Sequence, residues 1–314
     1  MWSHRHILGI AQLSRQDILV LLDSAERWFA VPRDEAKTAR VLHGRTIVNL
    51  FYESSTRTRT SFEVAGKRLG ADVVNVSPQT SSVTKGETLL DTLRNLESLR
   101  ADAIVLRHPA SGSAEFVSSR ARASIVNAGD GEHEHPTQAL LDALTIRRHR
   151  GSLEGLVVAI CGDILHSRVA RSIALLLGLL GAEVRLCGPR TLLPREAHVL
   201  GPTVKVTEKI DAAVEGADAV MMLRIQTERL NGSMIASTRE YARVFGLNPR
   251  VLALAKADAL VMHPGPINRG VEIDPAIADG PQSVILEQVE TGVALRMAVL
   301  EHVIAMSDAE RGRS

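Results

Sequence analysis

Residues 46–69 have the sequence TIVNLFYESSTRTRTSFEVAGKRL, and this stretch decides the fold. It opens with the β-branched and apolar run from Thr46 to Tyr52, which is typical of a buried strand. Polar residues follow, and the apolar residues after them, from Phe62 to Leu69, recur at helical spacing. A strand that leads through a short polar segment into a helix is the repeating unit of a parallel sheet with crossover helices.

The same alternation continues almost to the C-terminus. One helix, capped by Ser14, is predicted to run to about Ala30, and another from about Pro136 to His149. The predicted strands are 46–52, 71–76, 102–106 and 124–127, then 155–161, 182–187, 217–223 and 258–262. The pattern predicts an α/β protein throughout, with the first four strands in one open sheet and the last four in a second.

The two series of strands predict two domains, which also suits a chain of 314 residues. We expect a first domain over residues 1–150 and a second over 151–290. Each should be a doubly wound parallel sheet, with the active site in the cleft between them. The last helix, 292–306, is expected to return to the first domain, so that residues 291–314 pack back on it.

Composition places the chain among ordinary globular proteins. Hydrophobic residues make up 45% and charged residues 23%, which excludes disordered, collagen-like and disulfide-scaffold classes. A net charge of +1 provides no global field that would attract nucleic acid or an anionic membrane, so neither is an expected partner. The longest apolar run, Ile173 to Ala182, is too short to span a bilayer.

The N-terminal sequence predicts a cytoplasmic protein. Arg15 and Asp17 interrupt the stretch in which a secretory signal would need an unbroken apolar segment. The two cysteines, Cys161 and Cys187, each end an apolar run, and we expect them as small buried thiols rather than as a disulfide or a metal pair.

Ligands of open α/β sheets bind just beyond the carboxyl ends of the strands. After the strand 46–52, hydroxyls and an arginine meet at a helix start, in the segment Ser55-Thr56-Arg57-Thr58. Unpaired N–H groups and the positive end of the helix dipole favour an anion there, and an arginine fork matches phosphate. The segment predicts a phosphate cradle; the alternative is an ordinary Ser/Thr N-cap with solvated arginines.

Cations follow other predicted strands as well. Arg107 follows the third strand of the first series, and Arg168 and Arg224 follow strands of the second. Each alone is equally well explained as a surface cation or an exposed ion pair. Together with Arg57 they make four arginines just beyond strand ends, which favours a site for anionic substrates.

The fourth strand leads to His135 and Gln138 at the start of a helix whose first turn holds Pro136. Their side chains should face one spot. His133 and His135 also suggest zinc, but no third ligand lies at helical spacing, so we expect a hydrogen-bonding histidine and no metal. The polar loop 81–87 predicts a mobile lid, and its alternative is a solvent-exposed turn.

At this point the segment Phe51-Tyr52-Glu53-Ser54-Ser55-Thr56-Arg57-Thr58 resembles the signature of the carbamoyltransferases. The resemblance to the members that act on aspartate covers nearly all of the chain. It implies transfer of the carbamoyl group of carbamoyl phosphate to the α-amino group of L-aspartate, giving N-carbamoyl-L-aspartate and phosphate in pyrimidine biosynthesis, without a cofactor. It also implies a homotrimer with active sites between neighbouring subunits, and it leaves open regulatory chains or a dihydroorotase as partners.

The resemblance implies roles for individual residues. The implied carbamoyl-phosphate binders are Ser55, Thr56, Arg57, Thr58, Ser81, Lys85, Arg107, His135, Gln138, Gly265 and Pro266. The implied aspartate binders are Lys85, Arg168, Arg224 and Gln226. The implied catalytic residues are Arg57, Thr58, Lys85, Arg107 and His135. Ser81 and Lys85 resemble the loop that family members donate from the adjacent chain, and Pro266 matches a position that is often cis.

The second domain indicates the amino substrate. Ornithine enzymes of the family typically carry a His-Cys-Leu-Pro turn and a Ser-Met-Gly loop, whereas this chain has His263-Pro264-Gly265-Pro266 and Arg224-Ile225-Gln226. Arginines suit a dicarboxylate better than a cationic side chain. The chain departs from some aspartate members at Gly265 and Ile267, where they have Leu and Arg, and this departure puts partner chains in doubt.

Two other classes of protein stay open. The fold also suits a nicotinamide-dependent dehydrogenase, but neither G-x-G-x-x-G nor G-x-x-x-x-G-K-[ST] occurs in the sequence. A non-catalytic metabolite-binding homologue is the other class, and the presence of Lys85, His135 and Arg224 argues against it.

Overall fold

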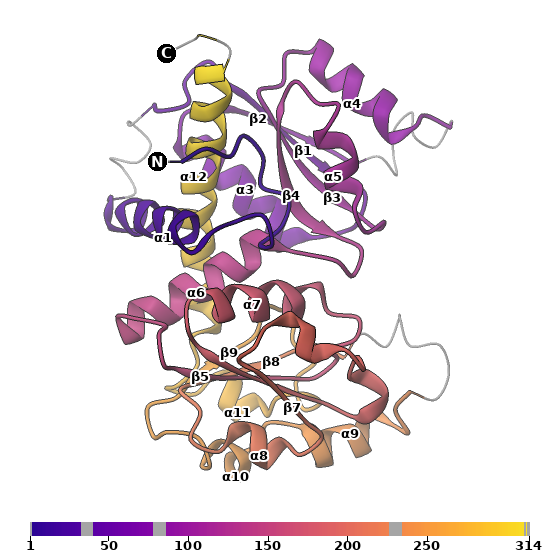
Figure 1. Ribbon diagram of the computed structural model, residues 1–314, viewed down its shortest axis with the longest axis vertical. Helices are drawn as coiled ribbons and strands as arrows, with labels where there is room; N and C mark the ends of the chain where they lie inside the picture. The colour runs from indigo at the N-terminus through magenta and orange to yellow at the C-terminus, as the bar shows by residue number, and fades with distance from the viewer. Residues whose placement is uncertain (1, 33–39, 78–85, 226–233, 311, 313–314) are drawn as a thin grey trace. The chain divides into compact units, whose positions relative to one another are not determined.

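The computed structural model describes residues 2–32, 40–77, 86–225, 234–310 and 312. The chain forms two compact units, each built on its own sheet (Figure 1). Unit 1 comprises Met1–Leu144 and Val289–Ser314, and unit 2 comprises Thr145–Gln288. The C-terminal part of the chain therefore belongs to unit 1.

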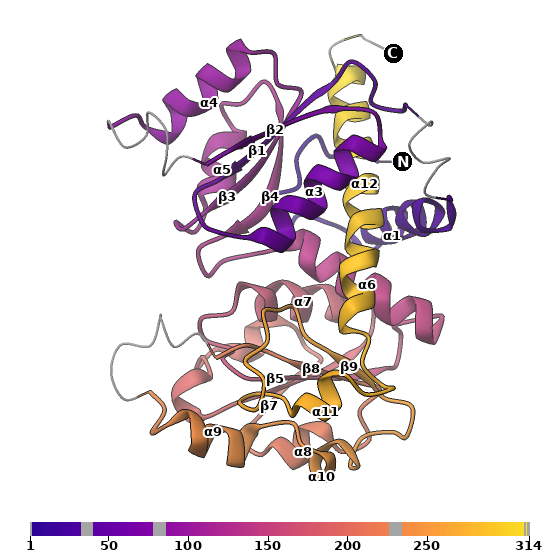
Figure 2. The ribbon, with the colours of Figure 1, turned by 180° about the vertical axis from the view of Figure 1, so that it is seen from behind.

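Unit 1 contains a four-stranded parallel sheet in the order β2-β1-β3-β4. Its strands are β1 (Thr46–Phe51), β2 (Asp72–Val76), β3 (Ala103–His108) and β4 (Ser124–Asp130). Its helices are α1 (Arg15–Ala30), α3 (Thr56–Arg68), α4 (Leu89–Ser98) and α5 (Ser113–Ser118), with parts of α6 (Pro136–Arg150) and α12 (Ile285–Glu310). The sheet separates α3 from α4 and α5, as the two opposite views show (Figures 1 and 2).

Apolar side chains on both faces of this sheet explain why helices cover it on both sides. Leu50 and Leu106 pack in one cluster with Leu93 of α4 and Val117 of α5. On the other face, Phe62 of α3 is fully buried. Each fully buried side chain of this size stabilises the fold by about 2 kcal/mol relative to an exposed one.

The first helix begins where the sequence predicts. The hydroxyl of Ser14 accepts a hydrogen bond from the backbone N–H of Asp17 at 3.1 Å. In return the carboxylate of Asp17 accepts one from the backbone N–H of Ser14 at 2.9 Å. This reciprocal capping box satisfies two N–H groups at the start of α1, and the helix runs to Ala30 as predicted.

Unit 2 contains a five-stranded parallel sheet in the order β7-β6-β5-β8-β9. Its strands are β5 (Val157–Cys161), β6 (Glu183–Cys187), β7 (Val204–Thr207), β8 (Ala219–Met222) and β9 (Leu260–Met262). Its helices are α7 (Arg168–Leu179), α8 (Ile210–Val214), α9 (Thr238–Phe245), α10 (Pro249–Leu252) and α11 (Pro275–Ala278), and the 3₁₀ turns are η3 (Arg190–Leu192) and η4 (Ala197–Leu200).

Two parallel sheets with alternating helices confirm the predicted α/β class, but two elements differ from the prediction. The sequence did not indicate β7, because this four-residue edge strand carries Lys205 and has no fully buried residue. The last helix is also longer than the predicted 292–306. Its first turns, from Ile285, mix glutamates with apolar residues and therefore lack an apolar run.

The two cysteines lie opposite each other at the ends of β5 and β6, and both thiols are free and buried. The contact with Cys187, together with burial, raises the pKa of the Cys161 thiol above its ordinary value. A buried thiol with a raised pKa is unreactive at neutral pH. No helix in the described part of the chain is long and apolar enough to cross a membrane.

Candidate active site

The carboxyl ends of β1, β3 and β4 lie at one edge of the first sheet, because these strands are parallel neighbours. The residues predicted for phosphate and carbamoyl binding in unit 1, as far as the structure describes them, lie at this edge. Ser55 to Thr58 follow β1, Arg107 lies at the end of β3, and His135 and Gln138 follow β4. The topology therefore gathers residues that lie far apart in the sequence.

The segment after β1 leaves the start of α3 open to an anion. Ser55 is the N-cap residue, but its side chain makes no capping hydrogen bond to the helix, all of which is described. The first turn of α3 contains no acidic residue. Thr58 is buried, whereas Arg57 is exposed, and desolvation by its neighbours lowers its pKa without removing its charge at neutral pH.

Arg107 connects the end of β3 to the segment after β1. Its Nε donates to Oε2 of Glu53 at 3.3 Å, and one terminal nitrogen donates to the hydroxyl of Ser55 at 3.3 Å. The side chain of Arg107 is only 15% exposed, and that of Glu53 is 20% exposed. A cation is thus fixed beside the first turn of α3, where it adds to the positive potential of the helix N-terminus.

The loop that carries His135 is held by one buried carboxylate. Asp130 accepts hydrogen bonds from the backbone N–H of Gly112 at 2.7 Å, the side-chain amide of Asn127 at 2.8 Å and the backbone N–H of Glu134 at 3.1 Å. His135 follows directly and is 4% exposed. The loop is therefore preorganised, which positions the imidazole before any substrate binds.

His133 also contacts this carboxylate, with Nδ1 lying 3.0 Å from Oδ2 of Asp130. Its partner is thus a neighbouring side chain of the same loop. Among the residues that the structure describes, no group of three His, Cys, Asp or Glu side chains is placed to hold a metal ion.

Asp130→Ala should lower both stability and carbamoyl-phosphate binding. Removal of the carboxylate leaves two buried N–H donors and the half-buried N–H of Gly112 without their acceptor, and we expect the free energy of unfolding to fall by about 3 kcal/mol. Urea unfolding monitored by circular dichroism measures this change. Asp211→Ala, which removes only an exposed partner of Arg250, serves as the control and should change stability far less. Equal losses of stability in Asp130→Ala and Asp211→Ala would contradict the role of Asp130 in holding the loop of His135.

A buried cation from α12 packs against α3. Arg296 of α12 is 3% exposed, donates to the hydroxyl of Ser61 at 2.9 Å and lies over the ring of Phe62, 5.0 Å from its centroid. Burial lowers the pKa of Arg296 to about 10, with a smaller lowering by the charge of Arg107 and an opposing effect of Asp142 included in that value. The guanidinium therefore stays charged at neutral pH.

Asp142 also binds one of the predicted residues. Its Oδ1 accepts a hydrogen bond from the side-chain amide of Gln138 at 2.9 Å. The charges of both Asp142 and Arg107 shift the pKa of Arg296, so these three side chains form one electrostatic network. The network connects α3, α6 and α12 within unit 1.

The carboxyl ends of β5, β8 and β9 form the corresponding edge of the second sheet. Arg168 begins α7 after β5 and is 7% exposed, and the N-cap residue Ser167 accepts from the backbone N–H of Ala170 at 3.1 Å. Arg224 follows β8 and is half-buried. The structure thus brings both predicted aspartate-binding arginines to one edge of one sheet.

The turn after β9 contains the predicted residues Gly265 and Pro266. The peptide bond between them is cis. Gly265 has a φ of +69°, a region that favours glycine, and its backbone N–H donates to Nδ1 of His263 at 2.8 Å. Three other predicted residues, Ser81, Lys85 and Gln226, lie outside the described residues, as does most of the predicted lid 81–87.

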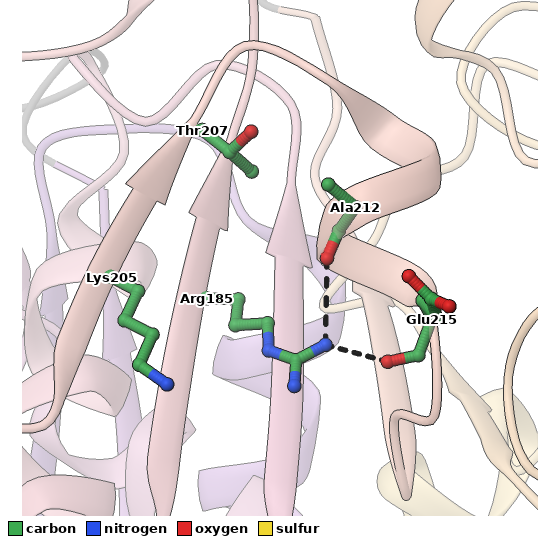
Figure 3. Close-up of a pocket in the computed structure, with 5 residues that line it drawn as sticks. All are labelled: Arg185, Lys205, Thr207, Ala212 and Glu215. Carbon is green, nitrogen blue, oxygen red and sulfur yellow. Dashed lines mark hydrogen bonds between the residues drawn. The ribbon is translucent and has the colours of Figure 1, made fainter.

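A surface pocket of about 390 Å³ lies elsewhere in unit 2, beside the edge strand β7 (Figure 3). Arg185, Lys205, Thr207, Ala212 and Glu215 line it. The guanidinium of Arg185 donates to the backbone carbonyls of Ala212 at 3.4 Å and Glu215 at 2.6 Å, which caps the end of α8. Glu183 pairs with Arg185 at 2.8 Å and with Lys205 at 2.6 Å, so both cations at this pocket are paired within the protein.

Comparison with known proteins bears directly on these two strand edges. Residues 5–148 match the family model described as the aspartate/ornithine carbamoyltransferase carbamoyl-P binding domain, and residues 154–303 match the Asp/Orn binding domain of the same family. The chain belongs to the aspartate/ornithine carbamoyltransferase family. The two matches together cover most of the chain.

Curated and solved members of this carbamoyltransferase family extend the comparison. The chain is 65% identical over 300 residues to the aspartate carbamoyltransferase catalytic subunit of Sorangium cellulosum, covering 96% of this chain and 93% of that protein. It is 34% identical to the aspartate transcarbamoylase of Trypanosoma cruzi solved with carbamoyl aspartate and phosphate, with a TM-score of 0.86 and 95% of each chain covered.

The ornithine carbamoyltransferase of Pyrococcus furiosus has a TM-score of 0.87 but only 29% identity, covering 96% of this chain and 97% of that one. Backbone shape therefore does not distinguish the two kinds of carbamoyltransferase. After β8 and β9 this carbamoyltransferase has Arg224 and the turn 263–266.

Sequence reasoning missed three polar residues of this carbamoyltransferase: two lie at the carboxyl edge of the first sheet, and the third contacts α3 from α12. Glu53, like Ser55, lies just after β1, so its position in the sequence could have identified it as a residue of this edge. Asp130 ends β4 and was usable for the same reason. Arg296 lies in the middle of a long helix, and nothing in the local sequence connects it to a strand end.

Proposed function

We propose that the protein is an aspartate carbamoyltransferase, which transfers the carbamoyl group of carbamoyl phosphate to the α-amino group of L-aspartate. The observation that carries this proposal is the pair of arginine-bearing strand edges. Arg107 is fixed beside an open helix N-terminus in unit 1, and Arg168 and Arg224 lie at the strand ends of unit 2. High identity to aspartate carbamoyltransferase catalytic subunits supports it.

Unit 1 binds carbamoyl phosphate in this proposal. The N–H groups at the start of α3, with the hydroxyls of Ser55, Thr56 and Thr58 and the guanidinium of Arg57, would surround the phosphate. The carbamoyl end would then contact the remaining described residues of this edge, which are Arg107, His135 and Gln138. The partial burial of Arg107 and His135 supports the proposal, because hydrogen bonds to an anion are stronger away from bulk water.

Unit 2 binds aspartate in this proposal. Arg168 and Arg224 would each bind a carboxylate, since guanidinium forks match carboxylates in geometry and charge. Gln226 and Lys85 would add further contacts, and the Gly265–Pro266 turn would contact substrate through its backbone. Several fixed cations are required, because two anionic substrates repel each other where water is excluded.

The reaction then needs no nucleophile from the enzyme. The neutral α-amino group of aspartate attacks the carbamoyl carbon, and a tetrahedral intermediate with a negatively charged oxygen forms. Thr58, Arg107 and His135 would stabilise this oxygen. The C–O bond to phosphate breaks, and the departing phosphate accepts the proton of the amine. Holding the two substrates together supplies much of the rate, because effective molarities reach about 10⁵ M or more.

The proposal extends to the assembly and its location. We propose a homotrimer in which Ser81 and Lys85 reach the site of a neighbouring subunit, so that Lys85 adds a cation to that site. We also propose the cytoplasm as its location and pyrimidine biosynthesis as its pathway. The free thiols of Cys161 and Cys187 suit a reducing compartment.

An assay of the purified protein tests the proposed activity. Carbamoyl phosphate is supplied with L-aspartate or with L-ornithine, and the carbamoylated amino acid is measured colorimetrically. We expect carbamoyl aspartate as the product and no citrulline above the background without enzyme. Citrulline formation at a comparable rate would contradict the choice of aspartate, and failure with both amino acids would contradict the transferase activity.

Arg224→Ala should raise the KM for aspartate by about 100-fold, because a charged, bidentate contact with a carboxylate is lost. The KM for carbamoyl phosphate should change far less, since that substrate is assigned to unit 1. Steady-state kinetics with each substrate varied in turn measures both values. Arg250→Ala removes an arginine that pairs with Asp211 on the surface of unit 2 and is the matched control. An equal rise in the KM values of both substrates in Arg224→Ala would argue against binding of carbamoyl phosphate by unit 1 and of aspartate by unit 2.

A further inference from the structure

We propose that Glu272 is a positioning residue that holds both substrate-facing segments of unit 2, the Gly265–Pro266 turn and the Arg224–Ile225 segment. This inference rests on the proposed function. Glu272 lies between β9 and α11, and it is fully buried. Its role follows from two branches of hydrogen bonds that begin at its Oε1.

The first branch runs through His263 to the turn. Nε2 of His263 lies 3.1 Å from Oε1 of Glu272, and both side chains are fully buried. Nδ1 of His263 accepts a hydrogen bond from the backbone N–H of Gly265 at 2.8 Å. Because Nδ1 acts as an acceptor, the ring proton belongs on Nε2 and is donated to Glu272. Glu272 therefore fixes the tautomer and the orientation of the imidazole that holds the turn.

The second branch runs through Asn268 to the end of β8. The backbone N–H of Asn268 donates to the same Oε1 of Glu272 at 2.6 Å. The side-chain amide of Asn268 donates to the backbone carbonyl of Ile225 at 3.2 Å. Ile225 is fully buried and directly follows Arg224. The backbone that carries Arg224 is therefore tied to the same carboxyl oxygen as the turn.

The backbone of Glu272 is anchored independently of its side chain. Its carbonyl accepts from the N–H of Leu247 at 2.9 Å, and the carbonyl of Leu247 accepts from the N–H of Asp274 at 2.9 Å. Substitution of the side chain should thus leave the segment around residue 272 in place. The substitution would loosen the two segments that the side chain holds, and a small misplacement of binding groups is enough to slow a reaction.

Three substitutions separate this role from a merely structural one. Glu272→Ala removes the acceptor of both branches, whereas Glu272→Gln keeps an oxygen that can accept both hydrogen bonds. Asn268→Ala breaks only the link to Ile225. Asp218→Ala is the matched control, because Asp218 is a buried carboxylate of the same unit that accepts from the N–H of Val157 at 2.9 Å, at the opposite end of β5.

The measurement is steady-state kinetics of carbamoyl aspartate formation by the purified protein, with thermal unfolding of each variant. We expect Glu272→Ala to lower kcat/KM for aspartate by about 100-fold, with recovery to within about tenfold of the wild type in Glu272→Gln. Asn268→Ala should raise the KM for aspartate by about tenfold with kcat nearly unchanged. Asp218→Ala should lower the unfolding temperature but leave kcat/KM within about threefold of the wild type.

The proposal is overturned if Glu272→Ala keeps the kcat/KM of the wild type, or if its loss is matched by Asp218→Ala. If Glu272→Ala does not fold, Asn268→Ala decides the matter, and an unchanged KM for aspartate in that variant overturns the proposal. A wild-type protein that forms no carbamoyl aspartate would instead refute the proposed function, which is a separate result.

Discussion

Arg57→Ala is expected to reduce kcat/KM for carbamoyl phosphate by about 1,000-fold. Arg57 lies in the first turn of α3, where the N-cap residue Ser55 leaves the N–H groups of the helix open. The substitution removes a charged fork from the phosphate while the buried residues of the helix, such as Phe62, remain in place. The loss should therefore be one of binding and not of folding.

Isothermal titration with inorganic phosphate separates these effects. We expect phosphate affinity to fall with kcat/KM in Arg57→Ala, while the unfolding temperature stays near that of the wild type. Lys67→Ala is the matched control, because Lys67 is an exposed cation in the last turn of the same helix and pairs with Glu63 at 2.6 Å. Near-normal phosphate affinity in Arg57→Ala would refute the phosphate cradle.

Mixing two inactive variants should restore activity if the sites are shared between subunits. Lys85→Ala and His135→Ala each put one lesion in every site of their own homotrimer. In a hybrid ring, one site combines the intact His135 of one chain with the intact Lys85 of its neighbour, and another collects both lesions. Random remixing of equal amounts should therefore restore about one quarter of the wild-type activity.

The two variants are dissociated, remixed and assayed for carbamoyl aspartate against unmixed controls. Native mass spectrometry of the remixed sample confirms that hybrid trimers have formed. The matched control is a double variant that carries both Lys85→Ala and His135→Ala in one chain. Mixed with either single variant, it should restore no activity. Hybrid trimers without activity would mean that Lys85 serves its own chain or no site at all.

The strand ends of this chain were predictable because a parallel sheet needs apolar runs, and the polar residues after them are then exposed at one edge. Ser55, Arg107, His135, Arg168 and Arg224 all lie at such positions in the structure. The strand β7 was not predictable, because an edge strand pairs on one side only and tolerates exposed residues such as Lys205.

Residues that support the site from a distance carried no comparable signal. Arg296 contacts α3 from the last helix, 235 positions away from Ser61. Glu272 lies in a loop after β9, and only the folded backbone brings its carboxyl to His263 and Asn268. Such contacts depend on tertiary structure, whereas the positions after strands depend on local patterns that a single sequence contains.

The new carbon–nitrogen bond is the most direct test of the proposed reaction. The purified protein is incubated with ¹³C-labelled carbamoyl phosphate and ¹⁵N-labelled L-aspartate, and the carbamoyl carbon is followed by ¹³C NMR. The account predicts that the carbamoyl phosphate signal is replaced by a signal split by coupling to one ¹⁵N nucleus, at the rate at which phosphate is released. Phosphate release without a split signal, with the label appearing in bicarbonate, would show hydrolysis in place of transfer and would contradict the account.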